Sequence, residues 1–438
     1  MSSPLFQSAK GVHDILPNDH LYFSYIKKVV RHHCRRAGYR RITTPHFEDA
    51  GVFHRSIGES SDIVEKEMFT FQSKGKKPKN YALKPEGTAG VVRAYLEHGM
   101  QQMPKPVELY YIEPHFRYDR PQKGRYRQFH QFGFEVIGES DPAIDAQVIY
   151  LAHKINQDLG IADMVTLQLN TIGSIEDRER YKEDLINYYT GKERSLCEDC
   201  KRRMKTNPLR LLDCKEEDCQ ILASMAPKFD SVMSDESKER FKLLKEYLNE
   251  LEVPFELNTQ LVRGLDYYSH TVFEFWSSSE GAQNAIGGGG RYDGLIELMG
   301  GEPTPAIGFA GGMERVMAYM KEAGIHPANK DAVAIFVAQL GLIAKRKSLA
   351  LLNKLRDKGI NTVGAIGKDS MKAQMGLADR INARYSLILG EVEVKEGMII
   401  LRDMKKGSQE TIPIEGIVDK MVELCGENAL KNKQLWEE

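Results

Sequence analysis

The stretch from Arg127 to Ile137, RQFHQFGFEVI, most narrowly limits what this chain can fold into. Its alternation of residue types is the pattern of a strand with one buried face. The expected core face consists of His130, Phe132, Phe134 and Val136. The opposite face would hold Arg127, Phe129, Gln131, Gly133 and Glu135. Only Gly133 separates Gln131 from Glu135, and a glycine there leaves space for a ligand to approach the backbone. A purely structural strand has little reason for such a gap, so we interpret this strand as part of a binding site.

A second predicted strand, Val107–Tyr118, precedes this one, and a strongly basic loop joins the two. Residues 116–127, FRYDRPQKGRYR, hold five cations and one carboxylate. A solvated hairpin loop would explain such a charge pattern without any ligand. A binding role is favoured by Arg117, because the end of its strand would bring the guanidinium within reach of an anion beside Gly133.

Another arginine stands just before a third predicted strand. The sequence LVRGLDYYSHTVFEF begins at Leu261, and its second half alternates in the manner of a strand rich in β-branched and aromatic residues. Arg263 lies near the start, followed by a glycine and then by Tyr267 and Tyr268. Because a guanidinium stays charged and offers a rigid fork of donors, we expect Arg263 to face an anion or a carbonyl group.

The bulk composition narrows the class of protein. The chain has 438 residues, enough for two or three domains, with 41% hydrophobic and 28% charged residues, as in globular proteins. A formal net charge of −1 provides no global basic field for nucleic acid, although local basic clusters remain. We see no secretory signal, and the longest apolar stretch, near 332–344, is too short to span a bilayer. Six cysteines without such a signal predict reduced thiols and a cytoplasmic protein.

Periodicity predicts a core that is interrupted by an insertion and followed by a smaller domain. The core is expected over 1–173 and again over 256–323. Residues 174–255 are charged, mostly helical in period and contain four of the six cysteines, so they form the insertion. A polar linker, 324–330, precedes residues 331–438, where strands alternate with helices and predict a separate α/β domain.

Neither of the common phosphate-binding loops is present. The sequence has no G-x-x-x-x-G-K-[ST] and no G-x-G-x-x-G that opens a helix, and the run Gly287–Gly290 fits neither pattern. A bound nucleotide would therefore depend on side chains, chiefly arginines, for its phosphate contacts. Apolar residues flank the glycine run closely, so we interpret it as a place where the backbone approaches something flat.

Two further fragments favour a nucleotide ligand. In KPEGTA, residues 84–89, Glu86 and Thr88 lie at a turn with free backbone N–H groups, although an ordinary helix cap has the same pattern. In PAIGFAGGMER, residues 305–315, a strand runs into a helix that has Arg315 in its first turn, near an end that favours anions. The glycines expected to clear a surface there are Gly308, Gly311 and Gly312. With the arginines already named, this slot would suit a planar base that carries a triphosphate.

These motifs resemble the signatures of a known enzyme family. FRYDRPQKGRYRQFHQFGFEVIG is similar to the second motif of class II aminoacyl-tRNA synthetases, GYRRITTPHFED to the first and GFAGGMERVM to the third. LVRGLDYY, GGGGRYDGL, KPEGTAG and KGVHDILP resemble motifs of histidyl-tRNA synthetases in particular. The resemblance runs from about Lys10 to the C-terminus and is weakest in the insertion.

The resemblance implies a fold and a reaction. The fold would be α/β (α+β): an antiparallel class II synthetase sheet with flanking helices, a helical insertion and a small anticodon-binding α/β domain at the C-terminus. The enzyme would be a histidine–tRNA ligase, which activates L-histidine with ATP to histidyl-adenylate and transfers it to the 3′ end of tRNA(His). Mg²⁺ that bridges the phosphates is implied by this chemistry. A cytoplasmic homodimer without membrane association would be expected.

The resemblance also implies roles for individual residues. The α-amino group of histidine would be held by Glu86, Thr88 and Gln131. The two imidazole nitrogens would be bound by Glu135 and Tyr268. The remaining histidine-binding residues would be Gly87, Arg117, Arg263, Tyr267 and Tyr292. The residues in contact with ATP would be Arg117, Arg125, Gly308, Gly311 and Arg315. Within that set, Arg117 would join Arg263 at the α-phosphate, and Arg315 would meet the γ-phosphate.

Arg263 and Arg117 are the expected catalytic residues. Attack of the histidine carboxylate on the α-phosphate builds negative charge on the equatorial oxygens. A cation already placed there stabilises the transition state more than the ground state. One departure from the family is Lys84, which stands where many relatives have arginine. The charge is kept although the fork of donors is lost, so we expect a mild effect.

Two other functions fit parts of the same pattern. A synthetase-like regulatory subunit of histidine biosynthesis would have no aminoacylation activity. Such a protein loses the catalytic motifs and lacks the C-terminal domain, whereas this chain keeps both. A class II synthetase for another amino acid is the second alternative. Glu135 beside Tyr268 disfavours it, because these groups would be left unpaired against an aliphatic substrate.

Four cysteines of the insertion form two close pairs, Cys197-x-x-Cys200 and Cys214-x₄-Cys219. The spacing would allow a tetrahedral Cys₄ zinc site of the structural kind. We nevertheless expect ordinary buried thiols and no metal ligands in this chain. The insertion is large enough to fold on apolar contacts, and the chemistry of the family needs no zinc. Carboxylates around the pairs also disfavour a concentration of thiolates.

Overall fold

The computed structural model describes residues 5–58, 61, 63–122, 124–212, 214, 216–277, 285–329 and 332–433, with the backbone alone over 426–433. The chain divides into two units, Met1–Pro327 and Ala328–Glu438. The linker expected at 324–330 and the domain expected from 331 meet at residues 330 and 331, which lie outside the described residues. In the described part of the chain, no helix is long and apolar enough to cross a membrane.

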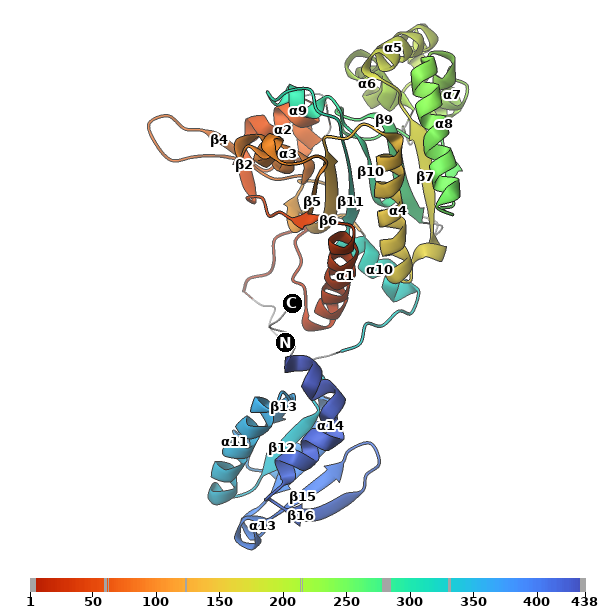
Figure 1. Cartoon of the computed structure of the whole chain (residues 1–438). Coiled ribbons are helices and arrows are strands. Elements are labelled where there is room, and N and C mark those ends of the chain that lie inside the picture. Colours follow the sequence, from red (N-terminus) through yellow and green to blue (C-terminus); the bar gives the residue numbers. More distant parts are fainter. Residues whose placement is uncertain are drawn as a thin grey trace. The chain divides into compact units, whose positions relative to one another are not determined.

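An eight-stranded sheet forms the centre of the first unit (Figure 1), in the order β1-β5-β6-β11-β10-β9-β7-β8. The two outermost pairs are parallel, and the neighbours between them are antiparallel. The strands are β1 (Arg40–Arg41), β5 (Val107–Phe116), β6 (Gln128–Ile137), β7 (Val165–Thr171), β8 (Glu256–Leu257), β9 (Ser269–Ser277), β10 (Ala285–Arg291) and β11 (Ala306–Gly312). The sheet with flanking helices that the sequence predicted is therefore confirmed.

Helices cover one face of this sheet and form the main core with it (Figure 1). They are α1 (Pro17–Arg36), α4 (Pro142–Asp158), α8 (Asp235–Glu250) and α10 (Met313–Glu322). Helix α1 begins at Pro17, where the missing N–H costs nothing, and its buried side chains recur every three or four residues. Phe132 and Phe134 of β6 pack in this core. The alternation expected along β6 is thus confirmed, because Glu135 lies on the other face among tyrosines.

The opposite face is covered by a smaller apolar cluster, and a second sheet packs on the neighbouring helix α2 (Ala50–Ile57). Helices α3 (Thr88–Glu97) and α9 (Leu295–Leu298) contribute to the cluster, and α2 packs on α3. The second sheet has the order β2-β4-β3, with β2 (Phe47–Asp49), β3 (Thr70–Gln72) and β4 (Asn80–Leu83). Single turns complete the unit outside the insertion at η1 (Ile63–Glu67), η2 (Met100–Gln102) and η3 (Ala162–Met164).

The glycine run, interpreted from the sequence as a place of close approach, forms most of strand β10. Gly287–Gly290 pair with both β9 and β11. A Cβ atom on Gly289 would lie 2.9 Å from the ring of Phe273, and one on Gly290 would lie 2.9 Å from the ring of Tyr268. Carbonyl oxygens and rings of the protein itself therefore approach the backbone at Gly289 and Gly290, whereas Gly287 and Gly288 line a cavity.

The insertion is mostly helical, as its period indicated. Its helices are α5 (Ile175–Tyr189), α6 (Glu198–Thr206), α7 (Glu217–Ser224) and α8, with short turns η4 (Glu193–Ser195), η5 (Pro208–Leu211) and η6 (Phe229–Ser231). Helix α5 begins with a capping box, because Ser174 accepts the N–H of Asp177 and the Asp177 carboxylate accepts the N–H of Ser174. The insertion has an apolar core of its own, which includes Leu185 and Leu211.

The second unit is an α/β domain, as predicted. Its sheet has the order β13-β12-β14-β15-β16, with β12 parallel to β13 and β14 and the remaining pairs antiparallel. The strands are β12 (Ile335–Gln339), β13 (Thr362–Gly364), β14 (Tyr385–Leu389), β15 (Met398–Asp403) and β16 (Gln409–Pro413). The helices are α11 (Leu342–Asp357), α12 (Met371–Arg380), α13 (Glu391–Glu396) and α14 (Ile417–Lys433). The short elements β13 and α13 were not expected from the sequence.

A fully buried ion pair joins strand β10 to helix α4. Arg291 Nε donates to Asp145 Oδ1 over 2.9 Å, and neither side chain is exposed. Thr271 Oγ1 donates to the other carboxylate oxygen over 2.6 Å. Arg291 Nη1 also donates to the carbonyl oxygen of Glu139 over 2.9 Å. This pair holds the main helical layer against the end of the glycine strand.

We expect Arg291→Ala to lower the free energy of unfolding of the first unit by about 3 kcal/mol, because Asp145 would remain buried with only Arg240, 3.5 Å away, as its cation. Urea unfolding followed by circular dichroism measures this loss. The control is the double variant Asp145→Ala/Arg291→Ala, which should lose less than the sum of the two single variants. Strictly additive losses would show that the two charges do not depend on each other.

Candidate active site

A cavity of about 370 Å³ opens on the face of the large sheet that the main helical layer leaves free. Strands β6, β9, β10 and β11 form its floor, and the loops before β6 and before β9 form its walls. Four arginines that the sequence predicted as site residues line it: Arg117, Arg125, Arg263 and Arg315. Gln131 lines it as well. The structure therefore brings together residues from motifs almost 200 positions apart in the sequence.

Three of these arginines, Arg117, Arg125 and Arg315, lie close enough for their charges to interact. Arg117 Nε donates to the carbonyl oxygen of Pro85 over 2.9 Å, and Arg315 Nε donates to that of Gly124 over 3.0 Å. Burial lowers the pKa of the Arg315 guanidinium, and the charges of Arg125 and Arg117 lower it further. Arginine stays charged even so, and cations that repel one another are stabilised by a ligand with several negative charges.

Arg263 lies above the floor of the cavity, in the loop before β9. It forms an ion pair with Glu274 of β9, and its guanidinium is 5.5 Å from the ring centroid of Tyr268. Gly288 makes room for it, since a Cβ atom there would lie 2.5 Å from Arg263 Nη1. Within the described residues, Arg263 Nε is buried and has no hydrogen-bond partner. Arg263 thus has donor capacity left for a ligand.

Glu135 lies deep on the same face of the sheet and is only 1% exposed. Its carboxyl group accepts hydrogen bonds from Tyr292 Oη over 2.6 Å, from Thr88 Oγ1 over 2.9 Å and from Tyr111 Oη over 3.4 Å. None of these three donors is a cation. Burial raises the pKa of Glu135 to about 8, and the nearby Glu86 contributes to the rise.

Glu86 is a second buried carboxyl group, placed at the beginning of helix α3. It accepts the backbone N–H groups of Thr88 and Ala89 over 2.7 and 2.8 Å. It therefore caps this helix, which is the ordinary role that the sequence left open. Burial still raises the pKa of Glu86, although the backbone N–H groups and Arg117 lower it in part. Two buried carboxyl groups this close together favour a cationic ligand.

Gln131 adds an acceptor to this end of the site. It lies on the same face of β6 as Glu135, since the two pair with Gly312 and Gly308 of β11 in one continuous register. Among the described residues, Gln131 Oε1 is buried without a hydrogen-bond partner. An unpaired buried acceptor is costly, so its presence in a cavity wall indicates a donor that arrives with a ligand.

Three buried tyrosines lie beside Glu135 and, like it, outside the residues that line the cavity. The ring centroids of Tyr267 and Tyr268 are 4.7 Å apart, and those of Tyr267 and Tyr292 are 5.7 Å apart. All three rings are buried. The tyrosines connect Arg263 to Glu135. The Arg263 guanidinium lies near the ring of Tyr268, and Tyr292 donates a hydrogen bond to Glu135. Tyrosine rings packed beside a carboxyl group would suit a flat polar ring as ligand.

The glycines expected to keep the slot open serve partly a different purpose. A Cβ atom on Gly308 would lie 1.6 Å from Glu135 Oε2, and one on Gly133 would lie 2.4 Å from Tyr111 Oη. On Gly311, a Cβ atom would point into the core, 2.6 Å from a phenylalanine ring. These positions make room for side chains of the protein. Gly312 meets the expectation, since its Cβ position has no neighbour closer than 3.8 Å.

Tyr111 and Glu274 take part in the site but were not predicted. Tyr111 occupies the space above two glycines and donates to Glu135, and Glu274 pairs with Arg263. Glu274 did leave a signal, because it is a carboxylate between two phenylalanines in a buried strand. Tyr111 left none, since a tyrosine in an apolar strand is equally typical of a core.

Lys84 lies beneath the site rather than in the cavity. Its ammonium group is 1% exposed, pairs with Glu113 and donates to the carbonyl oxygen of Thr44 over 3.1 Å. Thr44 in turn donates its backbone N–H to Glu113 over 2.9 Å. A compact ammonium suffices for this arrangement, which agrees with the mild effect expected of lysine in place of arginine.

Comparisons with known proteins give the same assignment as the geometry. The family model "Histidyl-tRNA synthetase" matches residues 11–316, and the model "Anticodon binding domain" matches residues 333–424. The histidine–tRNA ligase of Dehalococcoides mccartyi is 49% identical over 414 residues, 94% of this chain and 98% of that protein. The histidine–tRNA ligase of a Geobacillus species is 42% identical over 95% of this chain and 99% of its own length.

A solved structure extends the similarity to three dimensions. The crystal structure of apo Staphylococcus aureus histidyl-tRNA synthetase is 35% identical, covers 95% of this chain and all of its own, and superposes with a TM-score of 0.80. The similarity includes both units of the chain. On the extent of these matches and the arrangement of the site, the chain belongs to the histidyl-tRNA synthetase family.

Proposed function

We propose that this protein is a histidine–tRNA ligase that activates L-histidine with ATP and transfers the histidyl group to the 3′ end of tRNA(His). The observation that supports this most directly is the distribution of charge around one cavity. Four arginines and the unpaired amide oxygen of Gln131 line the cavity. The carboxyl groups of Glu86 and Glu135 are buried outside its lining, with Glu135 on the same face of β6 as Gln131. An amino acid with a cationic amino group and a nucleotide with a triphosphate would be bound side by side.

Histidine would bind beside Gln131, toward the buried carboxyl groups of Glu86 and Glu135. Its α-amino group would be held by Glu86, Thr88 and Gln131, and Gln131 Oε1 is available as an acceptor. Glu135 and Tyr268 would bind the imidazole nitrogens. The tyrosine rings, including Tyr267 and Tyr292, would enclose the imidazole ring. A pocket whose polar groups match both imidazole nitrogens rejects side chains that cannot pair with them.

ATP would bind over the glycine strands with its phosphates toward the arginines. Arg117 and Arg263 would flank the α-phosphate, and Arg315 would contact the γ-phosphate, with Arg125 beside it. Gly308 and Gly311 lie in the floor strand, but their missing side chains leave room mainly for protein groups. Mg²⁺ would arrive bound to the triphosphate as part of the substrate. Among the described residues, no cluster of three carboxylate or histidine ligands lies in this cavity to hold it separately.

The reaction then depends on charge and position. The histidine carboxylate attacks the α-phosphorus, the bond to the bridging oxygen of pyrophosphate breaks, and histidyl-adenylate and pyrophosphate form. Arg263 and Arg117 would stabilise the charge that grows on the equatorial oxygens. Glu274 holds Arg263 in the conformation seen here, and Trp276 Nε1 in turn donates to Glu274 Oε2 over 2.6 Å. The arginine is therefore positioned before ATP binds.

The second unit would recognise the tRNA. It is an α/β domain that matches an anticodon-binding family, and the second step of the reaction needs such a contact. We also propose that the enzyme works in the cytoplasm as a homodimer. The regulatory-subunit alternative is less supported, because the chain keeps this unit and the arginines of the cavity.

Histidine should be the one standard amino acid that drives ATP–pyrophosphate exchange, because Glu135 and Tyr268 match its two ring nitrogens. The measurement compares radioactive pyrophosphate incorporation with histidine, asparagine and glutamine at saturating ATP. Equal exchange with either amide would contradict the imidazole pocket. A protein that lacks exchange with every amino acid, while still folded and dimeric, would favour the regulatory-subunit alternative.

Arg263→Ala should slow adenylate formation on the order of 10³-fold, because the lost interaction matures in the transition state. The dissociation constant of histidine, measured by calorimetry without ATP, should change little. Arg263→Lys is the matched variant. Its rate of adenylate formation should lie between those of the wild type and Arg263→Ala, since lysine keeps the charge but loses the fork of donors. If histidine affinity falls as far as the rate, Arg263 binds the ground state and the proposed role is wrong.

The free energy of unfolding of Glu135→Gln, relative to that of the wild type, should be higher at pH 8 than at pH 5, both measured without ligand. The folded-state pKa of about 8 is raised above the ordinary value of 4.5, so the proton is held more tightly in the folded protein. The contribution of this carboxyl group to stability is therefore full below pH 4.5 and is lost as the pH rises toward 8. Each unit of raised pKa is worth about 1.4 kcal/mol, so the gain should reach a few kcal/mol.

The measurement is urea unfolding of both proteins at the two pH values. Glu246→Gln is the control for the same substitution at an exposed position, on helix α8. An effect of Glu135→Gln that is the same at both pH values would mean that Glu135 titrates normally.

A further inference from the structure

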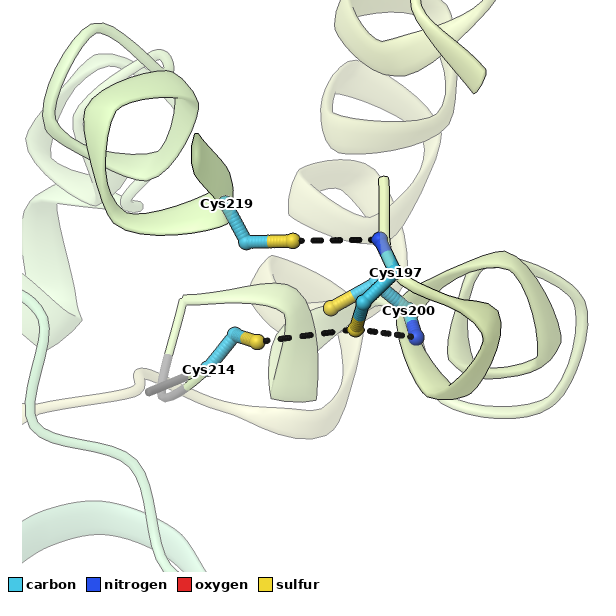
Figure 2. Close-up of side chains that lie close together, drawn as sticks. All are labelled: Cys197, Cys200, Cys214 and Cys219. Atoms are coloured by element: carbon cyan, nitrogen blue, oxygen red, sulfur yellow. Dashed lines mark hydrogen bonds between the residues drawn. The ribbon is translucent and has the colours of Figure 1, made fainter. Parts of the chain in front are cut away.

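The four cysteines of the insertion converge on one point. The sulfur atoms of Cys197, Cys200, Cys214 and Cys219 all lie within 4.8 Å of one another. Figure 2 shows Cys197 and Cys200 at the beginning of helix α6, Cys219 in the first turn of helix α7, and Cys214 on the segment before α7. Three of the four side chains are buried, and Cys197 is half-buried. The two pairs noted in the sequence therefore form a single cluster.

The spacing of the sulfur atoms matches a tetrahedral metal site. Zinc–sulfur bonds of about 2.3 Å place the sulfur atoms of a tetrahedral site about 3.8 Å apart. Cys197 Sγ and Cys214 Sγ are 3.8 Å apart, and no pair exceeds 4.8 Å. A disulfide would need a separation of about 2.05 Å, and all four cysteines are free. The cluster is therefore arranged for coordination rather than for cross-linking.

Backbone N–H groups donate to two of the four sulfur atoms. The N–H of Cys200 donates to Cys197 Sγ over 3.4 Å, and the N–H of Cys197 donates to Cys219 Sγ over 3.3 Å (Figure 2). Cys200 and Cys219 lie in the first turns of α6 and α7. Donors of this kind around metal-bound sulfur fix the ligands in place.

Packing alone does not explain the cluster. A cysteine that serves as a small apolar side chain needs only apolar neighbours, and such thiols can lie anywhere in a core. Here all four sulfur atoms face one another between two segments of chain. The carboxylates that seemed unfavourable in the sequence are mostly at the surface, where water screens them. Glu198, for example, is 90% exposed and pairs with Lys201.

We propose that Cys197, Cys200, Cys214 and Cys219 bind one Zn²⁺ in a closed, structural site. The four protein ligands leave no position for a substrate, so the metal takes no part in adenylation. It would fasten the beginning of α6 to the beginning of α7. This inference reverses the expectation of ordinary thiols from the sequence, because spacing along the chain could not show that the pairs meet.

The site would also support the loop that holds Arg263. Helix α6 runs from the first cysteine pair to Asn207, whose Nδ2 donates to Asp266 Oδ1 over 2.6 Å. Arg178 of α5 donates to the carbonyl oxygen of the same aspartate over 3.2 Å. Asp266 belongs to the loop between Arg263 and the tyrosines. The zinc site would thus fix one end of a short helix whose other end contacts the active-site loop.

The test is metal analysis of the full-length protein, purified without chelator from cells grown with zinc. We expect about one zinc per chain, and less than about a tenth of that in Cys200→Ser and Cys219→Ser. Cys34→Ser is the matched control, because Cys34 is buried in helix α1 outside the cluster and its variant should keep the metal. Wild-type protein without zinc, or variants of the cluster that retain it, would overturn the proposal.

A measurement on the wild-type protein covers the case in which the cysteine variants fail to fold. Exchange of the bound metal for Co²⁺ should give the visible and near-ultraviolet absorption of a tetrahedral thiolate site. A chelator should lower the thermal unfolding midpoint of the zinc-loaded protein, and added Zn²⁺ should restore it. Absence of the cobalt spectrum together with an unfolding midpoint that ignores both chelator and zinc would equally overturn the site.

Discussion

The two-sided character of the central sheet is the constraint on which the rest of the molecule depends. Side chains of a strand alternate between faces, so each strand that supports the core also presents groups to the cavity. Phe132 and Phe134 pack against helices, and Gln131 and Glu135 lie behind them on the other side. The helical layer is what keeps the sheet in place while its second face holds charged and unpaired groups that would be unfavourable on their own.

The carboxyl groups and the arginines on this face are mostly kept apart from each other. Glu135 has only neutral donors around it, and the arginines have few carboxylates, of which Glu274 is committed to Arg263. If the two sets had paired with each other, the cavity would be more stable without substrates and less able to bind them. The raised pKa of Glu135 and the lowered pKa of Arg315 are two expressions of this separation. Substrates would relieve both.

The sequence predicted the parts of the fold that follow from local pattern. Strand β6, the helices of the insertion and the α/β character of the second unit each follow from periodicity over a short window. Strand β10 was not predicted as a strand, because glycine has no side chain to alternate and a low strand propensity. Tyr111 and the meeting of the cysteine pairs were missed for another reason. Both depend on which segments become neighbours after folding, and that is decided by contacts far apart in the chain.

The contact between Glu135 and Gly308 has a consequence for how this protein can evolve. Any side chain at position 308 would begin 1.6 Å from the Glu135 carboxylate and 3.1 Å from the carbonyl oxygen of Phe134. A first mutation at Gly308 therefore damages the pocket, whatever residue it introduces. A first mutation at Glu135 would remove the group proposed to recognise the substrate. On that proposal, neither order of mutation would give a functional intermediate. The two positions would have to change together, which disfavours a stepwise change of amino-acid specificity.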